Sequence, residues 1–407
     1  MTGHVKVRAT LVIRRVIMVG AIAALCGALP APSADATSAS TLSPGKLAGQ
    51  RAGTSSIPLF AYYYLWFDHT SWNRAKKDYP LTGTYSSSDP RVVRAQMQEA
   101  KSAGINGFFV SWKNTPVNDQ RMRLLMTIAG QEHFKLAMIY EGLDFHRQPL
   151  PLTEVANGFK TFADHYASDP AFFRLGGKPL AIWSGTWAYS HADVAAVTAP
   201  VRGTIRVLAT EKNVAGFLRI ADATDGDAYY WSSVNPATNP YYGPKLDAMS
   251  HAVHRDGKYW IAPFAPGFDA RMVGGHEVVS RESGATLRTE YATALGSSPD
   301  VLGLISWNEF SENSYVEPSV RYKYQSLDVL RQLRGTSVPA PAGPAEPSDL
   351  GASSAASGPG PWPNLLRLAA FPLLLLGAVG ILRYARRHTA RRNLAKRGHA
   401  GQRTSDY

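Results

Sequence analysis

The sequence predicts an α/β protein whose main body is a (β/α)₈ barrel of the TIM type. Eight short apolar runs alternate with helix-like stretches between residues 57 and 335, and this alternation is typical of a repeated βα unit with a parallel sheet. The segment also has the usual size of such a barrel, roughly 250 residues or slightly more. A doubly wound open sheet is the weaker alternative, because no glycine-rich dinucleotide-binding fingerprint follows any run.

The predicted strands are the apolar runs themselves, which are rich in aromatic and aliphatic residues. Polar or turn-forming residues bound each of them. In chain order they are 58–66, 107–112, 135–141, 179–184, 205–209, 227–231, 259–264 and 301–307.

A helix is predicted after each strand. The clearest one starts at Asp89, an N-cap residue that is followed by Pro90 in the first turn, and it ends at Gly104. The other predicted helices are 119–132, 154–167, 244–256, 285–295 and 320–333, with weaker patterns at 191–198 and 211–216.

The first 36 residues have the layout of a secretory signal peptide. Four basic residues and no acidic residue precede Val16, an apolar run follows, and small residues lead to Ala36, the expected cleavage point. The single cysteine, Cys26, lies in this apolar run, so the cleaved protein is expected to have no thiol and no disulfide. Residues 37–56 are expected to be a linker.

The C-terminal end has the pattern of a membrane anchor. A linker rich in Pro, Gly, Ser and Ala is predicted at 336–361, a transmembrane helix at 362–384, and a basic cytoplasmic tail at 385–407. The barrel is therefore expected outside the cytoplasm of a single-pass membrane protein. Most of the formal net charge of +12 belongs to the two basic ends, so it reports membrane orientation and does not indicate a nucleic-acid partner.

Aromatic, carboxylate and amide residues gather at the predicted carboxyl ends of the strands, where barrel enzymes place their sites. A single aromatic residue at such a place usually serves packing. Together these residues suit a sugar, whose C–H faces lie on aromatic rings and whose hydroxyls need polar partners. The predicted substrate-binding residues are Tyr63, Trp66, Asp68, Trp112, Glu141, Tyr230, Trp231, Phe268 and Asn308.

Two glutamates that follow the last predicted strand are the candidate catalytic pair. Glycosidic cleavage needs one carboxylic acid and one carboxylate and no metal. Glu309 and Glu312 are three residues apart, so their Cα atoms lie within roughly 11 Å of each other and both side chains can reach one bond. This spacing allows either a retaining or an inverting reaction. A partly desolvated pair of like charges is expected to hold one proton near neutral pH, whereas Glu317, before Pro318, is expected to be structural.

Other chemistries find no support in the sequence. The chain contains no G-x-S-x-G elbow, no H-E-x-x-H and no phosphate-binding loop. Its eleven histidines lack the spacing of metal ligands. We therefore expect neither a metal nor a cofactor.

Four stretches resemble motifs of glycoside hydrolase family 99, the endo-α-mannosidases and endo-α-mannanases, and more distantly the α-1,3-glucanases of family 71. They are FAYYYLWFDHTSW (60–72), GTYSSSDPRVVRAQMQEAKSAGINGFFVSW (83–112), PFAPGFDARMV (263–273) and ISWNEFSENSYVEPS (305–319). The similarity extends over about 58–334 and implies a (β/α)₈ barrel.

The resemblance also implies a role for each glutamate. Glu309 would deprotonate the 2-hydroxyl of the substrate, which attacks the anomeric carbon and forms a 1,2-anhydro sugar. Glu312 would act first as acid and then as base, with net retention, and Glu141 would contact the substrate. The family usually has a tryptophan, a histidine and a glycine at the positions of Phe310, Ser311 and Asn313, and a tyrosine at the position of Phe268. These differences bear on which sugar is recognised.

The sequence thus favours a membrane-anchored, extracytoplasmic glycoside hydrolase that is endo-acting on an α-linked polysaccharide. Two alternatives stay open. The first is a glycan-binding or envelope-assembly protein on a barrel that has lost activity. The second is a transglycosylase, since a retaining intermediate can be intercepted by a sugar hydroxyl in place of water.

Overall fold

A computed structural model describes residues 57–74, 76–144, 146–231 and 234–336 of the chain. The predicted signal peptide, the linkers, the transmembrane helix at 362–384 and the basic tail lie outside these residues, apart from the first residue of the second linker. Within the described segments, no helix is both long and apolar enough to cross a membrane.

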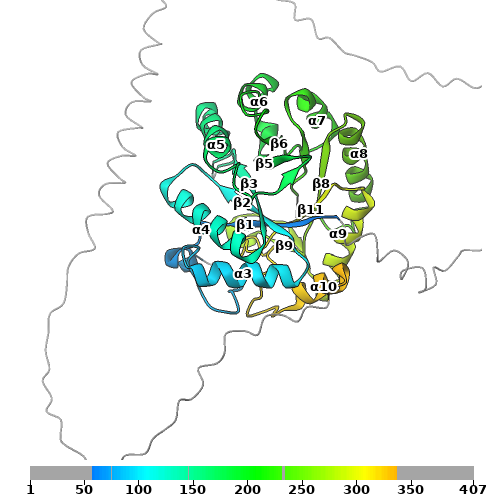
Figure 1. Cartoon of the computed structure of the whole chain (residues 1–407). Coiled ribbons are helices and arrows are strands. Elements are labelled where there is room, and N and C mark those ends of the chain that lie inside the picture. The colour runs from blue at the N-terminus through cyan, green and yellow to red at the C-terminus, as the bar shows by residue number, and fades with distance from the viewer. Residues whose placement is uncertain (1–56, 75, 145, 232–233, 337–407) are drawn as a thin grey trace, which may run out of the picture. The chain divides into compact units, whose positions relative to one another are not determined.

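The described residues form a curled, parallel sheet of the TIM-barrel type with helices around it (Figure 1). Parallel pairing runs without a break through β6, β5, β3, β2, β1, β11, β8 and β7. A parallel bridge between Ala209 and Asp227 then joins β6 to β7. These strands are β1 (Leu59–Tyr64), β2 (Gly107–Trp112), β3 (Lys135–Glu141), β5 (Lys178–Ser184), β6 (Arg206–Leu208), β7 (Gly226–Ala228), β8 (Tyr259–Phe264) and β11 (Val301–Leu304).

The helices lie around the outside of the strands in chain order, as Figure 1 shows. The Asp89 side chain accepts a hydrogen bond from the Arg91 N–H and caps the first of them, so the predicted cap is confirmed. The helices are α3 (Pro90–Ser102), α4 (Pro116–Glu132), α5 (Leu152–His165), α6 (His191–Thr198), α7 (Val214–Ile220), α8 (Tyr242–Arg255), α9 (Ala285–Gly296) and α10 (Gln325–Arg334).

The strands are apolar along their whole length because both of their faces are buried. In β1, Leu59, Ala61 and Tyr63 pack against the helices. Phe60 and Tyr62 of the same strand point into the barrel and pack with side chains of the opposite strands. The alternation of side chains along one strand thus builds two cores, one outside the sheet and one inside it.

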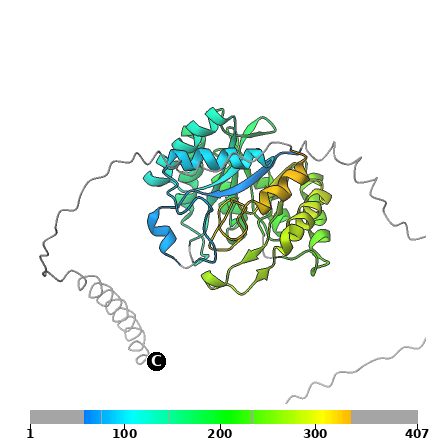
Figure 2. The ribbon, with the colours of Figure 1, turned by 90° about the horizontal axis from the view of Figure 1, so that it is seen from below.

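Some structure goes beyond the sequence prediction. A 3₁₀ helix, η1 (His69–Asn73), follows β1, and a two-stranded hairpin of β9 (Phe268–Asp269) and β10 (Val278–Val279) follows β8. A short strand, β4 (Arg174–Leu175), pairs with β5 in the antiparallel direction. In the side view of Figure 2 the hairpin and η1 lie at the same end of the barrel.

Candidate active site

The candidate active site, called the catalytic cavity below, is a hollow of about 430 Å³ at the carboxyl ends of the strands. Its lining comes from β1, β2, β3, β5 and the segments after β1, β2, β3, β7 and β11, which is the end of a barrel where enzymes of this fold place their sites. The lining residues are Tyr64, Trp66, Ser111, Trp112, Lys113, Asn118, Glu141, Leu143, Asp144, Arg147, Ser184, Tyr230, Glu309 and Glu312.

Glu309 is a buried carboxyl held by its own turn. Its backbone N–H donates to Ser306 Oγ at 2.8 Å, and its Oε1 accepts from the Ser311 N–H at 2.9 Å. Burial, together with the nearby negative charge of Glu312, raises the pKa of Glu309 to about 7, against a smaller opposing effect of Lys76. A carboxyl of this kind can accept and release a proton at neutral pH.

Glu312 lies beside Glu309 and is less enclosed. Burial also raises its pKa, while the positive charge of Arg147 acts in the opposite direction and Glu141 adds to the rise. Its backbone carbonyl accepts the Asp269 N–H at 2.7 Å, so the β9–β10 hairpin fixes the turn that carries this glutamate. The prediction that the two side chains share one site agrees with this arrangement.

Asn308 fastens the glutamate turn to the end of β1. Its Oδ1 accepts the Tyr64 N–H at 2.8 Å and its Nδ2 donates to the Tyr64 carbonyl at 3.0 Å. The same amide donates to the Tyr85 hydroxyl at 3.2 Å. Asn308 therefore takes over the backbone pairing where the ladder between β1 and β11 ends.

A buried carboxyl lies behind this contact. Glu317 accepts hydrogen bonds from Tyr85 Oη at 2.9 Å and from Gln96 Nε2 at 2.7 Å, and Gln96 in turn accepts the Tyr63 hydroxyl at 2.9 Å. Burial raises the pKa of Glu317 to about 8. Glu317 lies outside the cavity lining and is linked to the glutamate turn through Tyr85, in keeping with the structural role expected of it.

Two tyrosine hydroxyls meet at the cavity. Tyr64 and Tyr230, from the ends of β1 and β7, share a hydrogen bond, and the ring of Tyr64 packs at 4.4 Å from that of Trp66. Trp66 is 43% exposed, unusual for so large a ring. It therefore offers an aromatic face at the cavity mouth.

The structure brings together six of the residues predicted for the site: Trp66, Trp112, Glu141, Tyr230, Glu309 and Glu312. Five others lie elsewhere. Tyr63 is buried against α3, and the Asp68 carboxylate caps η1 by accepting from the Thr70 and Ser71 N–H groups. Trp231 lines neighbouring cavities and Phe268 begins the hairpin. Asn308 is not part of the cavity lining and is bonded to the Tyr64 backbone.

The sequence prediction missed several lining residues, among them Tyr64, Ser111, Lys113, Arg147 and Ser184. Ser111 donates to Glu141 at 3.1 Å, so two neighbouring strand ends share a contact. Ser111 could have been predicted as a lining residue, because it stands one residue before the end of its strand. Arg147 could not have been predicted in this way, because it lies in a loop whose path the sequence pattern does not determine.

Within the described segments, no group of three or more His, Cys, Asp or Glu side chains is placed to hold a metal ion. The lining of the cavity holds paired carboxyls, hydroxyls and cations. This set can transfer protons and bind sugar hydroxyls.

Comparison with known proteins places the chain among glycosidases. Over 271 residues it is 25% identical to a mouse glycoprotein endo-α-1,2-mannosidase-like protein, covering 60% of this chain and 58% of that protein. A rat glycoprotein endo-α-1,2-mannosidase is 24% identical over 271 residues, which is 60% of this chain and 56% of the relative. The chain thus spans less than three fifths of the length of these curated relatives.

Among solved structures, the endo-α-mannosidase of family 99 from Bacteroides thetaiotaomicron, in complex with bis-tris-propane, has the same fold with a TM-score of 0.60. Its sequence is 22% identical, and the match covers 69% of this chain and 98% of that one. The model of glycosyl hydrolase family 99 matches residues 68–333. Since this match takes in most of the chain, the protein belongs to glycosyl hydrolase family 99.

Proposed function

We propose that this protein is a retaining glycoside hydrolase that cleaves an α-linked, mannan-like polysaccharide within its chain. The observation that carries the proposal is the pair Glu309 and Glu312, two carboxyls with raised pKa values in one cavity at the carboxyl ends of the barrel strands. Family membership and the names of the relatives support the mannoside.

In this proposal Glu309 accepts the proton of the substrate 2-hydroxyl, and Glu312 protonates the departing glycosidic oxygen. A base works best when its pKa lies near the working pH, and the pKa of Glu309 is about 7. Glu312 is more open to the cavity and lies within the field of Arg147 and Glu141. It is therefore placed to exchange a proton with the leaving group and then with water.

The remaining cavity residues would hold the sugar ring. Glu141, kept in place by Ser111, and the hydroxyl of Tyr230 are the proposed hydroxyl partners. Trp66 offers the exposed aromatic face on which a sugar C–H surface can lie. Since Phe310 lies in a buried cluster with Trp72 and Tyr315, its difference from the family tryptophan alters the packing behind the site.

We further propose that the barrel acts outside the cytoplasm and is held by the apolar segment 362–384. This proposal rests on the sequence pattern alone.

The experiment is incubation of the purified protein with a panel of α-mannans and α-glucans. We expect products of intermediate length from an α-mannan, and proton NMR of the first product should show the α-anomer. Release of a β-anomer would contradict retention. Binding of mannan with no cleavage would instead favour a glycan-binding protein, and longer products made from short donors would favour transglycosylation.

A further inference from the structure

Two further hollows lie next to the catalytic cavity, on the side of β5, β6 and β7. The first, of about 60 Å³, shares lining residues both with the catalytic cavity and with a third hollow of about 470 Å³. We call this third hollow the distal groove. The shared residues are Leu143, Arg147, Ser184 and Tyr230 on the catalytic side, and Lys212, Tyr229 and Trp231 on the distal side.

The distal groove differs in chemistry from the catalytic cavity. Three glutamates and Asp144 line the catalytic cavity, whereas no Asp or Glu stands among the described residues that line the groove. Trp231 and Tyr241 offer rings that are 38% and 79% exposed. Its lining residues are Lys212, Asn213, Tyr229, Trp231, Val234, Asn239, Tyr241, Tyr242 and Lys245.

The two lysines of the groove hold their amines over aromatic rings. Lys245 Nζ lies 4.7 Å from the ring centre of Tyr229, and Lys212 Nζ lies 3.3 Å from that of Trp187. Neither lysine forms an ion pair within the part of the chain that the structure describes. Burial lowers the pKa of Lys245, as expected of an amine that lacks a carboxylate partner.

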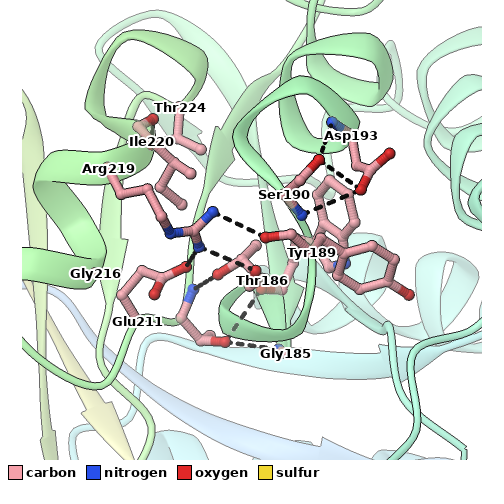
Figure 3. Close-up of polar contacts among 12 residues, drawn as sticks. Gly185, Thr186, Tyr189, Ser190, Asp193, Glu211, Gly216, Arg219, Ile220 and Thr224 are labelled. Carbon is pink, nitrogen blue, oxygen red and sulfur yellow. Dashed lines mark hydrogen bonds and ion pairs between the residues drawn. The ribbon is translucent and has the colours of Figure 1, made fainter.

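A hydrogen-bonded network includes Glu211, the residue before Lys212 in the chain, and Figure 3 shows its contact with Arg219. Glu211, the nearest carboxylate in sequence, is buried and accepts Arg219 Nη2 at 3.1 Å. Arg219 Nη1 also donates to the Tyr189 carbonyl at 2.8 Å. This pairing ties the end of β6 and α7 to the segment that follows the 3₁₀ turn Thr186–Ala188, which carries Trp187.

The geometry points to a distal subsite that binds a sugar unit carrying an anionic group, a phosphoryl or a carboxyl, on the same glycan chain that enters the catalytic cavity. The inference rests on the proposed function and adds a charge preference to it. Because each hollow shares lining residues with the next, one glycan chain can reach from the catalytic cavity to the distal groove. The exposed rings of Trp231 and Tyr241 suit its C–H faces. The amines of Lys212 and Lys245 then supply the charge-assisted hydrogen bonds that an oxyanion accepts.

The test uses three α-linked mannotetraoses that differ only at C6 of one terminal unit: a hydroxyl, a phosphate or a carboxylate. Their binding is measured by calorimetry on the full chain carrying Glu309→Gln, which prevents turnover. Each tetraose is also tested with Lys245→Met added, and with Lys160→Met added as the matched control. Lys160 is exposed on α5 and lines none of the three hollows.

We expect an anionic tetraose to bind about tenfold more tightly than the neutral one, since one hydrogen bond to a charged group supplies roughly that factor. This advantage should disappear with Lys245→Met or in high salt and persist with Lys160→Met. A preference for phosphate over carboxylate, or the reverse, identifies the group.

Equal binding of all three tetraoses would overturn the inference and leave the proposed function intact. An anionic preference that survives Lys245→Met would also overturn it. Failure of every tetraose to bind would contradict both proposals. If wild-type protein bound the anionic tetraoses more tightly but cleaved none of the tetraoses or longer mannans, the result would support the subsite and contradict the proposed hydrolysis.

Discussion

Lys76 is one of the groups that influence the pKa of Glu309. This half-buried lysine lowers the pKa of the Glu309 carboxyl, against the larger effect of burial. Glu309 must be ionised to accept a proton, so the acidic limb of kcat/KM follows its pKa. Lys76→Met removes the charge and raises this pKa, and we expect the limb to move to higher pH.

The measurement is the pH profile of kcat/KM on a mannoside with a good leaving group. Lys160→Met removes a lysine charge on the exposed face of α5 and should leave the limb in place. An unchanged limb with Lys76→Met would show that another group governs the acidic side.

Glu317 should make stability depend on pH. Its pKa is about 8 in the folded protein and about 4.3 in an unfolded chain. Between these values the folded state binds more protons than the unfolded state, so the contribution is fully present below about pH 4 and falls as pH rises towards 8. The slope is about 1.4 kcal/mol per pH unit for this group.

Denaturant unfolding at pH 5, 6 and 7 tests this dependence. Between pH 5 and pH 7, the free energy of unfolding of Glu317→Gln should fall less steeply than that of wild type. The difference in slope should be up to about 1.4 kcal/mol per pH unit. Glu154→Gln, at an exposed position of α5, is the control and should keep the wild-type dependence. Parallel curves for wild type and Glu317→Gln would mean that Glu317 is ionised in the folded protein at pH 5.

At the residue scale, the sequence predicted some of the lining side chains near strand ends and missed others, both in strands, such as Tyr64, Ser111 and Ser184, and in loops. Glu141 ends β3, whereas Glu309 and Glu312 lie in the segment after β11, which ends at Leu304 and not at residue 307 as predicted. Asp68 was misplaced because a carboxylate after a strand can equally cap a following helix, as it does for η1. The side chain of Arg147 reaches the cavity only through its loop.

The cap of α3 offers a test at the scale of elements. The Asp89 carboxylate accepts the Arg91 N–H at 2.9 Å. Asp89→Ala leaves this donor without its partner, and we expect a loss of about 1 kcal/mol in the free energy of unfolding. Asp89→Asn is the matched control, since asparagine caps a helix about as well. Equal losses for the two variants in denaturant unfolding would show that the charge matters and the cap does not.

Strand positions were predicted closely because burial on both faces leaves a continuous apolar run. β2, β3 and β8 have the predicted bounds. The last helix was predicted from 320 but begins at Gln325, because Ser319 and Lys323 exchange backbone hydrogen bonds in a turn. Val320 and Tyr322 belong to that turn, although their spacing fits a helix.

At the scale of the whole molecule, the alternation of strands and helices was enough to predict the barrel type, since few topologies satisfy it. The extra hairpin after β8 depends on contacts with distant residues, such as that of Lys77 with Asp269. No local sequence pattern predicts it. The membrane anchor stays a prediction, because 362–384 lies outside the described residues.

That anchor predicts a fixed orientation. Protease added to intact cells should remove the barrel and leave the basic tail 385–407 protected, because basic flanks stay on the cytoplasmic side. An antibody against the tail measures the protected fragment on a blot, and cells opened with detergent provide the control. Loss of the tail signal from intact cells would contradict the orientation.

The most direct test of the central claim compares Glu309→Gln and Glu312→Gln on two substrates, an α-mannan and a mannoside with a good leaving group. General-acid help is worth roughly 10² to 10⁴ in rate where the leaving group is poor. Glu312→Gln should therefore lose that factor on mannan and much less on the activated mannoside, whereas Glu309→Gln should lose activity on both. Wild-type turnover by both variants would contradict the assignment of these two glutamates as the catalytic pair.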